Sequence, residues 1–203
     1  KIDNYLLWLL VISALIRAFL AAFLEFGNDE VYYWTYAKYP DWSHFDHPGM
    51  VGWVMQLFSL NLLFDSELAL RLSSVVFMTI NTYIIYKMGC LIKNKLTGFY
   101  AALLYTSSVY AFVVTGILIL PDTPLMLFML LSLYCFLRFF IGREKNNGES
   151  WKNDNVMLVL GGFLAGLSML SKYSGVFIWS GVGLYVLLYD RKLLKNKYLY
   201  ISV

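Results

Sequence analysis

Three short polar segments interrupt an otherwise apolar chain of 203 residues, and their side chains can transfer protons or bind phosphate. The first, residues 27–36, reads GNDEVYYWTY and places two adjacent carboxylates, Asp29 and Glu30, before a group of aromatic residues. Adjacent residues on a helix point about 100° apart, so the two carboxylates cannot face one ligand together. We expect one to be catalytic and the other structural. The alternative is a helix N-terminus at which both acids merely stabilise the macrodipole.

The second segment, residues 40–49, reads PDWSHFDHPG and contains both histidines of the chain. Within seven residues it gathers two carboxylates and two imidazoles, namely Asp41, His44, Asp46 and His47. This combination can bind a divalent metal or a phosphate. The alternative is a hydrated loop whose Trp42 and Phe45 rest at lipid headgroups. The sequence alone favours neither interpretation.

The third segment, residues 120–125, reads LPDTPL, and a lone lysine, Lys172, follows later in the sequence LSKYSG. Pro124 is typical of the first turn of a helix. Asp122 or Thr123 would then serve only as a helix cap. A cation between apolar spans usually marks a pathway or a binding site, although a lysine can also extend toward the headgroups. Asp122 and Lys172 therefore each have a functional and a structural interpretation.

The composition predicts a membrane protein. Hydrophobic residues make up 60% of the chain and charged residues 14%, and the mean hydropathy is +0.63. Soluble domains are about half apolar and about a quarter charged. The surplus apolar surface needs lipid as its solvent, which predicts an all-α polytopic membrane protein. No run of basic residues is interleaved with aromatics, so nucleic acid is not an expected partner.

A membrane-spanning helix needs roughly 20 mostly apolar residues. Six stretches approach this requirement: residues 5–24, 68–92, 97–120, 124–141, 156–171 and 173–189. The long first loop, residues 25–67, contains a shorter apolar run at 50–64, for which we expect a helix lying at the membrane interface. A further apolar stretch begins near Tyr198. We expect the chain to be the N-terminal part of one transmembrane domain whose C-terminal remainder is missing.

The distribution of lysine and arginine predicts the orientation in the membrane. With a cytoplasmic N-terminus, three cytoplasmic loops hold eleven of the sixteen cations: Lys87, Lys93, Lys95, Arg138, Arg143, Lys145, Lys152, Arg191, Lys192, Lys195 and Lys197. The first external loop holds one cation, Lys38, and seven of the thirteen acids. This orientation brings the three polar segments and Lys172 to the external face. Arg17 interrupts the first span, and we expect it to face other helices or to snorkel.

Acids and cations gathered at one membrane face suit an enzyme that works on a lipid-linked substrate. A lipid-borne phosphate needs cations, and a hydroxyl acceptor needs a carboxylate base. Two alternatives remain. A transporter or lipid-carrier flippase would place ionisable residues near the midplane and show broken helices or repeats. A non-catalytic membrane assembly subunit would leave the external acids solvated.

Taken in order, the motifs resemble the N-terminal half of a polyprenyl-phosphate-dependent glycosyltransferase of the GT-C superfamily. The motif residues are Asp29 and Glu30 before Tyr32, Tyr33 and Trp34; Asp41 with Trp42; Phe45 to Pro48; Pro121 to Pro124; and Leu170 to Tyr173. The chain is most similar to the family that joins bacterial relatives of dolichyl-phosphate-mannose protein mannosyltransferases with the aminoarabinose transferase of lipid A. The resemblance covers roughly residues 6–189.

The resemblance implies a GT-C-like helix bundle that moves a sugar, with inversion, from a polyprenyl-phosphate carrier to an acceptor. It also implies a multi-pass protein of the bacterial plasma membrane with its active site on the external, periplasmic face. The expected partners are therefore the polyprenyl-phosphate-sugar donor and membrane lipid. The sugar, a hexose or a pentose, stays open, and so does the acceptor, which is a protein, a lipid or a glycan.

By the same resemblance, Asp29 and Asp122 match catalytic acids on the attacking side, and Asp29 is the expected general base. Substrate-binding roles fall on Glu30, Tyr33, Asp46, His47, Lys172 and Tyr173. Lys172 and His47 would stabilise the leaving phosphate. The aminoarabinose branch has lysine where this chain has His47, so the charge of that contact here depends on pH. Arg71 is a further candidate or an anchor at the headgroups.

No cofactor is certain from the sequence. A divalent metal bound by Asp29, Asp46 and His47 is left open, because these residue types can ligate one but their spacing demands none.

Overall fold

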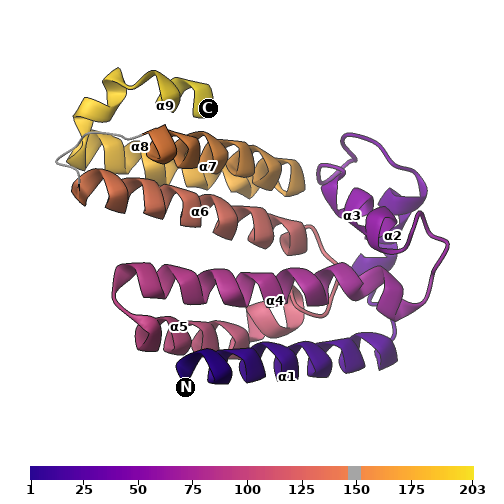
Figure 1. Ribbon diagram of the computed structural model, residues 1–203. Helices are drawn as coiled ribbons and strands as arrows, with labels where there is room; N and C mark the ends of the chain where they lie inside the picture. The colour runs from indigo at the N-terminus through magenta and orange to yellow at the C-terminus, as the bar shows by residue number, and fades with distance from the viewer. Residues whose placement is uncertain (146–151) are drawn as a thin grey trace.

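The computed structural model describes residues 1–145 and 152–203, and all regular elements in this part of the chain are helical. In chain order they are α1 (Ile2–Phe23), α2 (Asn28–Lys38), α3 (Met50–Phe58), α4 (Glu67–Ile92), α5 (Lys95–Ser107), the π-helical turn η1 (Tyr110–Val114), α6 (Asp122–Lys145), α7 (Lys152–Ser171), the 3-10 turn η2 (Tyr173–Val176), α8 (Phe177–Tyr189), the 3-10 turn η3 (Arg191–Lys195) and α9 (Lys197–Ser202). Figure 1 shows the long helices running side by side, with α2 and α3 gathered at one end.

Three helices are long and apolar enough to cross a membrane, namely α1, α4 and α6. Two shorter apolar helices cover residues 155–171 and 173–189. The all-α polytopic membrane fold expected from the composition is therefore confirmed. Which end of the bundle faces the cytoplasm stays a prediction.

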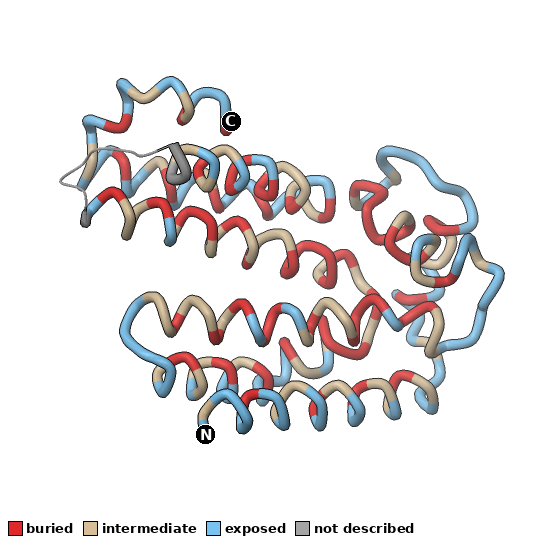
Figure 2. The backbone as a smooth tube through the Cα atoms, viewed as in Figure 1, coloured by how far each residue is buried: buried red, intermediate tan, exposed pale blue. Residues whose placement is uncertain are grey.

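The helices pack in two groups that meet where α4 contacts α6. One group contains α1, α4 and α5, and the other contains α6, α7, α8 and α9. Figure 2 shows buried residues concentrated on the facing sides of these helices. Arg17 on α1 is fully buried, donates a hydrogen bond to the Thr106 hydroxyl and lies 5.3 Å from the ring centre of Phe112. Of the two expected positions, Arg17 therefore takes the one that faces other helices.

The expected uninterrupted helix over residues 97–120 is wrong. The helix α5 ends at Ser107, a π-helical turn follows, and regular helix resumes only at Asp122. Ser108 has an extended backbone with a ψ angle of 141°. Its hydroxyl donates to a carbonyl in the preceding turn at 2.8 Å and accepts an N–H from the following turn at 3.3 Å. Such side-chain bonds to the backbone compete with the helical ladder and favour a break.

The unwound backbone after the π-helical turn bonds with groups on distant parts of the chain. The Leu118 carbonyl accepts hydrogen bonds from the hydroxyls of Ser74, at 2.9 Å, and Thr123, at 3.1 Å. The Ile119 N–H donates to the Glu30 carboxylate at 3.0 Å. Non-helical backbone at membrane depth persists only where protein or water satisfies its polar groups. Hydropathy gives no sign of these partners, because the apolar composition continues through the break.

The interfacial run expected at residues 50–64 is helical only as far as Phe58. Three consecutive residues after it, Leu60, Asn61 and Leu62, have φ angles of 51°, 59° and 62°. This left-handed backbone ends the helix and turns the chain toward α4. The Ser59 hydroxyl accepts the Leu62 N–H at 2.9 Å, which holds the turn in place.

Helices α2 and α3 are packed so closely that a glycine is required between them. A Cβ atom at Gly52 would lie 2.6 Å from the carbonyl carbon and oxygen of Tyr36. Tyr36 also belongs to a buried apolar cluster between these helices, which consists of Tyr36, Ala37, Val51, Met55 and Ile119. This packing fixes the loop between α2 and α3 against the rest of the bundle.

We expect Gly52→Ala to destabilise the protein, because overpacking a closed contact costs about 1–3 kcal/mol. The melting temperature in detergent measures the effect. Gly166→Ala in α7 is the matched control, since a Cβ there meets nothing within 4 Å and alanine favours helix over glycine. Equal melting temperatures for the two variants would contradict the close contact between α2 and α3.

Candidate functional site

The predicted site residues come from separate elements that meet at one end of the bundle, which we call the α2–α3 end (Figure 1). These residues are Asp29 and Tyr33 on α2, Asp46 and His47 in the loop before α3, Asp122 at the start of α6, Lys172 after α7, and Tyr173 at the start of η2. Residues from Asp29 to Tyr173, which are far apart in the chain, therefore share one region.

Lys172 and Asp122 form an ion pair at the centre of this region. The Lys172 ammonium donates to both carboxylate oxygens of Asp122, at 2.8 and 3.1 Å, and the Tyr110 hydroxyl donates to Asp122 at 2.8 Å. The side chains of Lys172 and Asp122 stay 32% and 18% exposed, so a substrate can still reach them. We expected the two on opposite sides of a substrate. The structure instead joins them, because each provides the opposite charge that the other needs.

Tyr33 lies among carboxylates from three different segments. Burial raises the pKa of Tyr33 to about 12, and the negative charges of Asp29, Asp46 and Asp122 add to the rise. These three acids are therefore close enough to interact electrostatically with one phenol. At neutral pH the Tyr33 hydroxyl stays protonated and can donate a hydrogen bond to an anion.

His47 lies near the same charges. The pKa of His47 lies below its ordinary value of 6.5, mainly because the side chain is partly buried and also because of the positive charge of Lys172. The negative charges of Asp46 and Asp122 oppose this shift. Its ring centre lies 5.9 Å from that of Tyr33. The His47 Nδ1 atom is buried and has no hydrogen-bond partner in the described part of the chain. At neutral pH the imidazole is therefore mostly uncharged and has one nitrogen unused.

The loop that carries His47 is held by aromatic and backbone contacts. The His44 ring stacks on the buried ring of Tyr36 with 3.7 Å between centroids. The backbone N–H of His44 donates to the His47 carbonyl at 3.0 Å. The Ser43 hydroxyl lies 3.5 Å from that of Tyr173. This last contact connects the loop to η2, next to Lys172.

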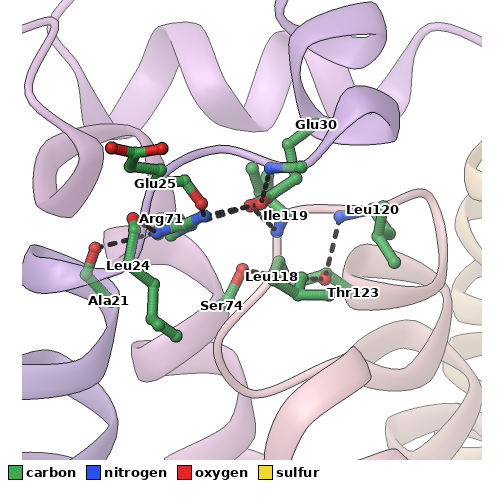
Figure 3. A network of polar contacts seen from close by, with 11 residues as sticks. Ala21, Leu24, Glu25, Glu30, Arg71, Ser74, Leu118, Ile119, Leu120 and Thr123 are labelled. Carbon is green, nitrogen blue, oxygen red and sulfur yellow. Dashed lines mark hydrogen bonds and ion pairs between the residues drawn. The ribbon is translucent and has the colours of Figure 1, made fainter.

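Glu30 lies in a buried network of hydrogen bonds with Arg71 and the backbone of Ile119 (Figure 3). Its side chain is 1% exposed. One oxygen accepts from Arg71 Nε at 2.7 Å and from the Ile119 N–H at 3.0 Å. The other accepts from Arg71 Nη2 at 2.6 Å and from the Gly27 N–H at 3.1 Å. A carboxylate has about four acceptor positions. All are used here, so the expected substrate contact of Glu30 is replaced by a structural role.

Arg71 is equally occupied. In addition to Glu30 it donates to the carbonyls of Ala21, Leu24 and Glu25 at the end of α1, at 3.1, 2.5 and 3.0 Å. It is fully buried. Arg71 is therefore neither a phosphate ligand nor a headgroup anchor in this conformation. It joins the end of α1 to the start of α2.

Two hydroxyl groups that support the site, those of Tyr110 and Ser74, were not predicted from the sequence. Tyr110 bonds Asp122 from the break after α5, and Ser74 on α4 supports the backbone just before Asp122. A polar side chain within an apolar span is the signal that could have indicated Ser74. Nothing local indicated Tyr110, because its partner is brought to it by the unwound segment.

No group of three His, Cys, Asp or Glu side chains in the described residues is arranged to hold a metal ion. Asp29, Asp46 and His47, the set left open by the sequence, are therefore not assembled as a ligand cluster.

Comparison with known protein families gives a match. A family model described as dolichyl-phosphate-mannose-protein mannosyltransferase matches residues 46–203. The matched region contains Asp46, His47, Asp122, Lys172 and Tyr173, whereas α2 lies before it. No curated protein and no solved structure gives a significant match.

Proposed function

Because the chain belongs to the dolichyl-phosphate-mannose-protein mannosyltransferase family, we propose that it transfers a sugar from a polyprenyl-phosphate carrier to an acceptor at the membrane surface. The family model covers more than half of the chain. The coarse assignment to a glycosyltransferase family rests on that match. The residue roles, the stereochemistry of transfer and the orientation in the membrane are our proposals.

One observation carries the proposal: the Lys172–Asp122 ion pair lies beside other proton-transferring side chains at the end of a bundle of apolar helices. Departure of a lipid phosphate from a sugar develops negative charge, which a fixed cation stabilises. Attack by an acceptor hydroxyl requires a base that removes its proton. The α2–α3 end offers both kinds of group: Asp29, Asp46 and Asp122 lie within electrostatic range of Tyr33, and Lys172 is paired with Asp122.

We assign the base to Asp29, which is exposed in the first turn of α2 and has no hydrogen-bond partner in the described structure. Lys172 neutralises the leaving phosphate, and Asp122 orients its ammonium group. Tyr33 and His47 donate hydrogen bonds to the donor. Asp46 and Tyr173 line the same region, and Asp46 favours the protonated form of His47.

Base and leaving-group cation on different elements suit an in-line displacement, and therefore inversion at the anomeric carbon. The basic residues at the other end of the bundle support a cytoplasmic location for that end. The α2–α3 end would then face the outside of a bacterial plasma membrane. The hexose or pentose transferred and the acceptor are not specified by these contacts.

The full-length protein in liposomes, supplied with radiolabelled polyprenyl-phosphate mannose and a membrane extract as acceptor source, tests the function. We expect the label to leave the carrier. Lys172→Met should lower this turnover by about 10²-fold or more, because one fixed donor to developing charge contributes that much. Lys38→Met is the matched control, since Lys38 is exposed on α2 and lies over the Trp34 ring.

A lipid-carrier flippase is the main competing function, and the same liposomes distinguish it. A flippase would carry the labelled lipid across the bilayer with its sugar attached. Sugar that stays on the carrier while the carrier crosses the membrane would refute transfer. No turnover and no crossing would favour a non-catalytic subunit.

We expect His47 to make the reaction pH-dependent. Because the pKa of His47 lies below its ordinary value, the imidazolium form, which is the better phosphate ligand, predominates only at acidic pH. The kcat/KM value for the donor, which reports the free enzyme, should therefore rise on acidification through that pKa. His47→Lys should flatten the profile, because lysine stays charged. His44→Gln is the control, and a profile that is identical in the wild type and His47→Lys would rule out the imidazolium.

A further inference from the structure

The end of the bundle opposite the α2–α3 end contains two adjoining cavities that the sugar-transfer site does not use. One is a polar pocket of about 650 Å³ where α6, α8 and η3 converge. The other is an apolar groove of about 480 Å³ between α6 and α8, with Met88 of α4 at its edge. The two cavities share Phe140, Glu144 and Tyr185 in their walls. A ligand with a polar head and an apolar tail can therefore occupy both at once.

The charges in the polar pocket leave an excess of unpaired cations. Asp190 is bonded to Arg143, which holds the pKa of that carboxyl below its ordinary value and keeps it ionised. The pair is internally neutral. Among the described residues that line the pocket, Arg191 and Lys192 then face one remaining carboxylate, that of Glu144.

Arg191 is held with its charge accessible. Its Nε atom donates to the Leu187 carbonyl at 2.8 Å, and its side chain is exposed. The described structure gives its two terminal nitrogens no protein partner. A guanidinium anchored through Nε presents these two parallel donors in the geometry that phosphate accepts.

The composition of the groove suits an acyl chain. Its wall is lined by apolar side chains from Phe136 and Leu137 on α6 to Phe177 and Val182 on α8. Gly181 lies in this wall, and a Cβ there would meet nothing within 4 Å. Where the groove adjoins the pocket, the rings of Phe140 and Tyr185, which line both cavities, are 4.2 Å apart.

We propose that these cavities bind one anionic glycerophospholipid, with its phosphate at Arg191 and Lys192 and one acyl chain in the groove between α6 and α8. Charge complementarity selects this ligand: basic pockets between membrane helices bind anionic headgroups, and each basic residue near the surface adds to the affinity. The adjoining groove commits the site to a lipid rather than to free phosphate. The proposal is independent of sugar transfer, because the phosphate would bind where the ends of α6 and α8 meet η3, whereas Lys172 precedes α8.

Native mass spectrometry of the full-length protein in neutral detergent tests the proposal by titration with dioleoyl phosphatidylglycerol or dioleoyl phosphatidylcholine. We expect one phosphatidylglycerol to be retained with an affinity about tenfold above that for phosphatidylcholine. The double variant Arg191→Gln with Lys192→Gln should remove this preference. Lys195→Gln with Lys197→Gln is the matched control at the same end, outside the pocket wall, and should keep the preference.

A second pair of variants tests the groove. Gly181→Leu fills the open space without a clash and should weaken binding of both lipids by about tenfold, because it displaces acyl chain from an apolar site. Gly183→Leu, on the same helix with equally open space but outside the groove wall, should bind like the wild type. Three outcomes would each overturn the proposal. They are equal affinity for the two lipids, equal losses in the Arg191/Lys192 and Lys195/Lys197 double variants, and no retained lipid because a later segment of the chain fills the groove.

Discussion

Asp29→Asn is expected to lower the rate of sugar transfer by about 10²- to 10⁴-fold while leaving the melting temperature in detergent unchanged. The magnitude is that of losing a positioned general base. Asparagine keeps the shape of the side chain and its place in the first turn of α2, but it cannot accept the proton of an attacking hydroxyl. The measurement is the single-turnover rate with saturating labelled donor, which separates chemistry from donor binding.

The structural basis of this prediction is the contrast between two neighbouring acids. Asp29 is exposed and has no hydrogen-bond partner in the described part of the chain, whereas Glu30 is buried with every acceptor position used. Only Asp29 can change partners during a reaction. Its negative charge already acts on Tyr33, which places it beside the donor groups of the site.

Asp65→Asn is the matched control for Asp29→Asn. Asp65 is an exposed carboxylate in the same long first loop, between α3 and α4, and it makes no described contact with the site. Its replacement should leave the transfer rate unchanged. A similar loss of rate in both variants would indicate a general effect of surface charge, and an active Asp29→Asn variant would transfer the base role to another residue.

Glu30→Gln is expected to lower the free energy of unfolding by about 3–5 kcal/mol. Removing one partner of a buried ion pair leaves the other charge uncompensated in a medium that solvates it poorly. Glutamine retains one oxygen acceptor, but its NH₂ group would face two donors, Arg71 Nη2 and the Gly27 N–H. Both of these donors now bond to one carboxylate oxygen. Unfolding in mixed micelles, followed by circular dichroism, measures the loss.

A double-mutant cycle identifies the origin of that loss. Arg71→Met alone should also be strongly destabilising, whereas the two changes together should cost clearly less than the sum of the single changes. Lys95→Gln is the control for ordinary ion pairs, because Lys95 and Asp3 are both 61% exposed and should tolerate the change with little loss. Additive losses in Glu30→Gln and Arg71→Met would mean that the two side chains do not act as a pair.

The sequence predicted where the chemistry gathers because charge asymmetry depends only on counting. Asp29, Asp46, His47, Asp122 and Lys172 were each assigned to one membrane face, and they lie together at the α2–α3 end. Helix geometry alone assigned one of the adjacent acids Asp29 and Glu30 to a structural role without choosing between them, and the family resemblance gave the base to Asp29 and a substrate contact to Glu30. Burial made that choice, and burial depends on α4, which supplies Arg71 from 41 residues away.

The break between α5 and α6 was not predictable from hydropathy. Apolar residues continue from α5 through Ile119, so the composition of a helix and that of a buried, unwound segment are alike. What differs is the source of hydrogen bonds for the backbone. Here they come from Glu30, Ser74 and Thr123, which lie on three other elements.

The Glu30 network also sets an order of events during biosynthesis. When Glu30 leaves the ribosome, its guanidinium partner has not been made, and the Ile119 amide follows 89 residues later. The Glu30 carboxylate in the nascent first loop therefore stays unpaired until α4 has been inserted. Its fourth hydrogen bond, from the Ile119 N–H, forms only after the segment before α6 has been made. Completion of the Glu30 network is therefore a late step in membrane insertion, and a chain arrested before residue 119 would hold α2 without the bond from the Ile119 N–H.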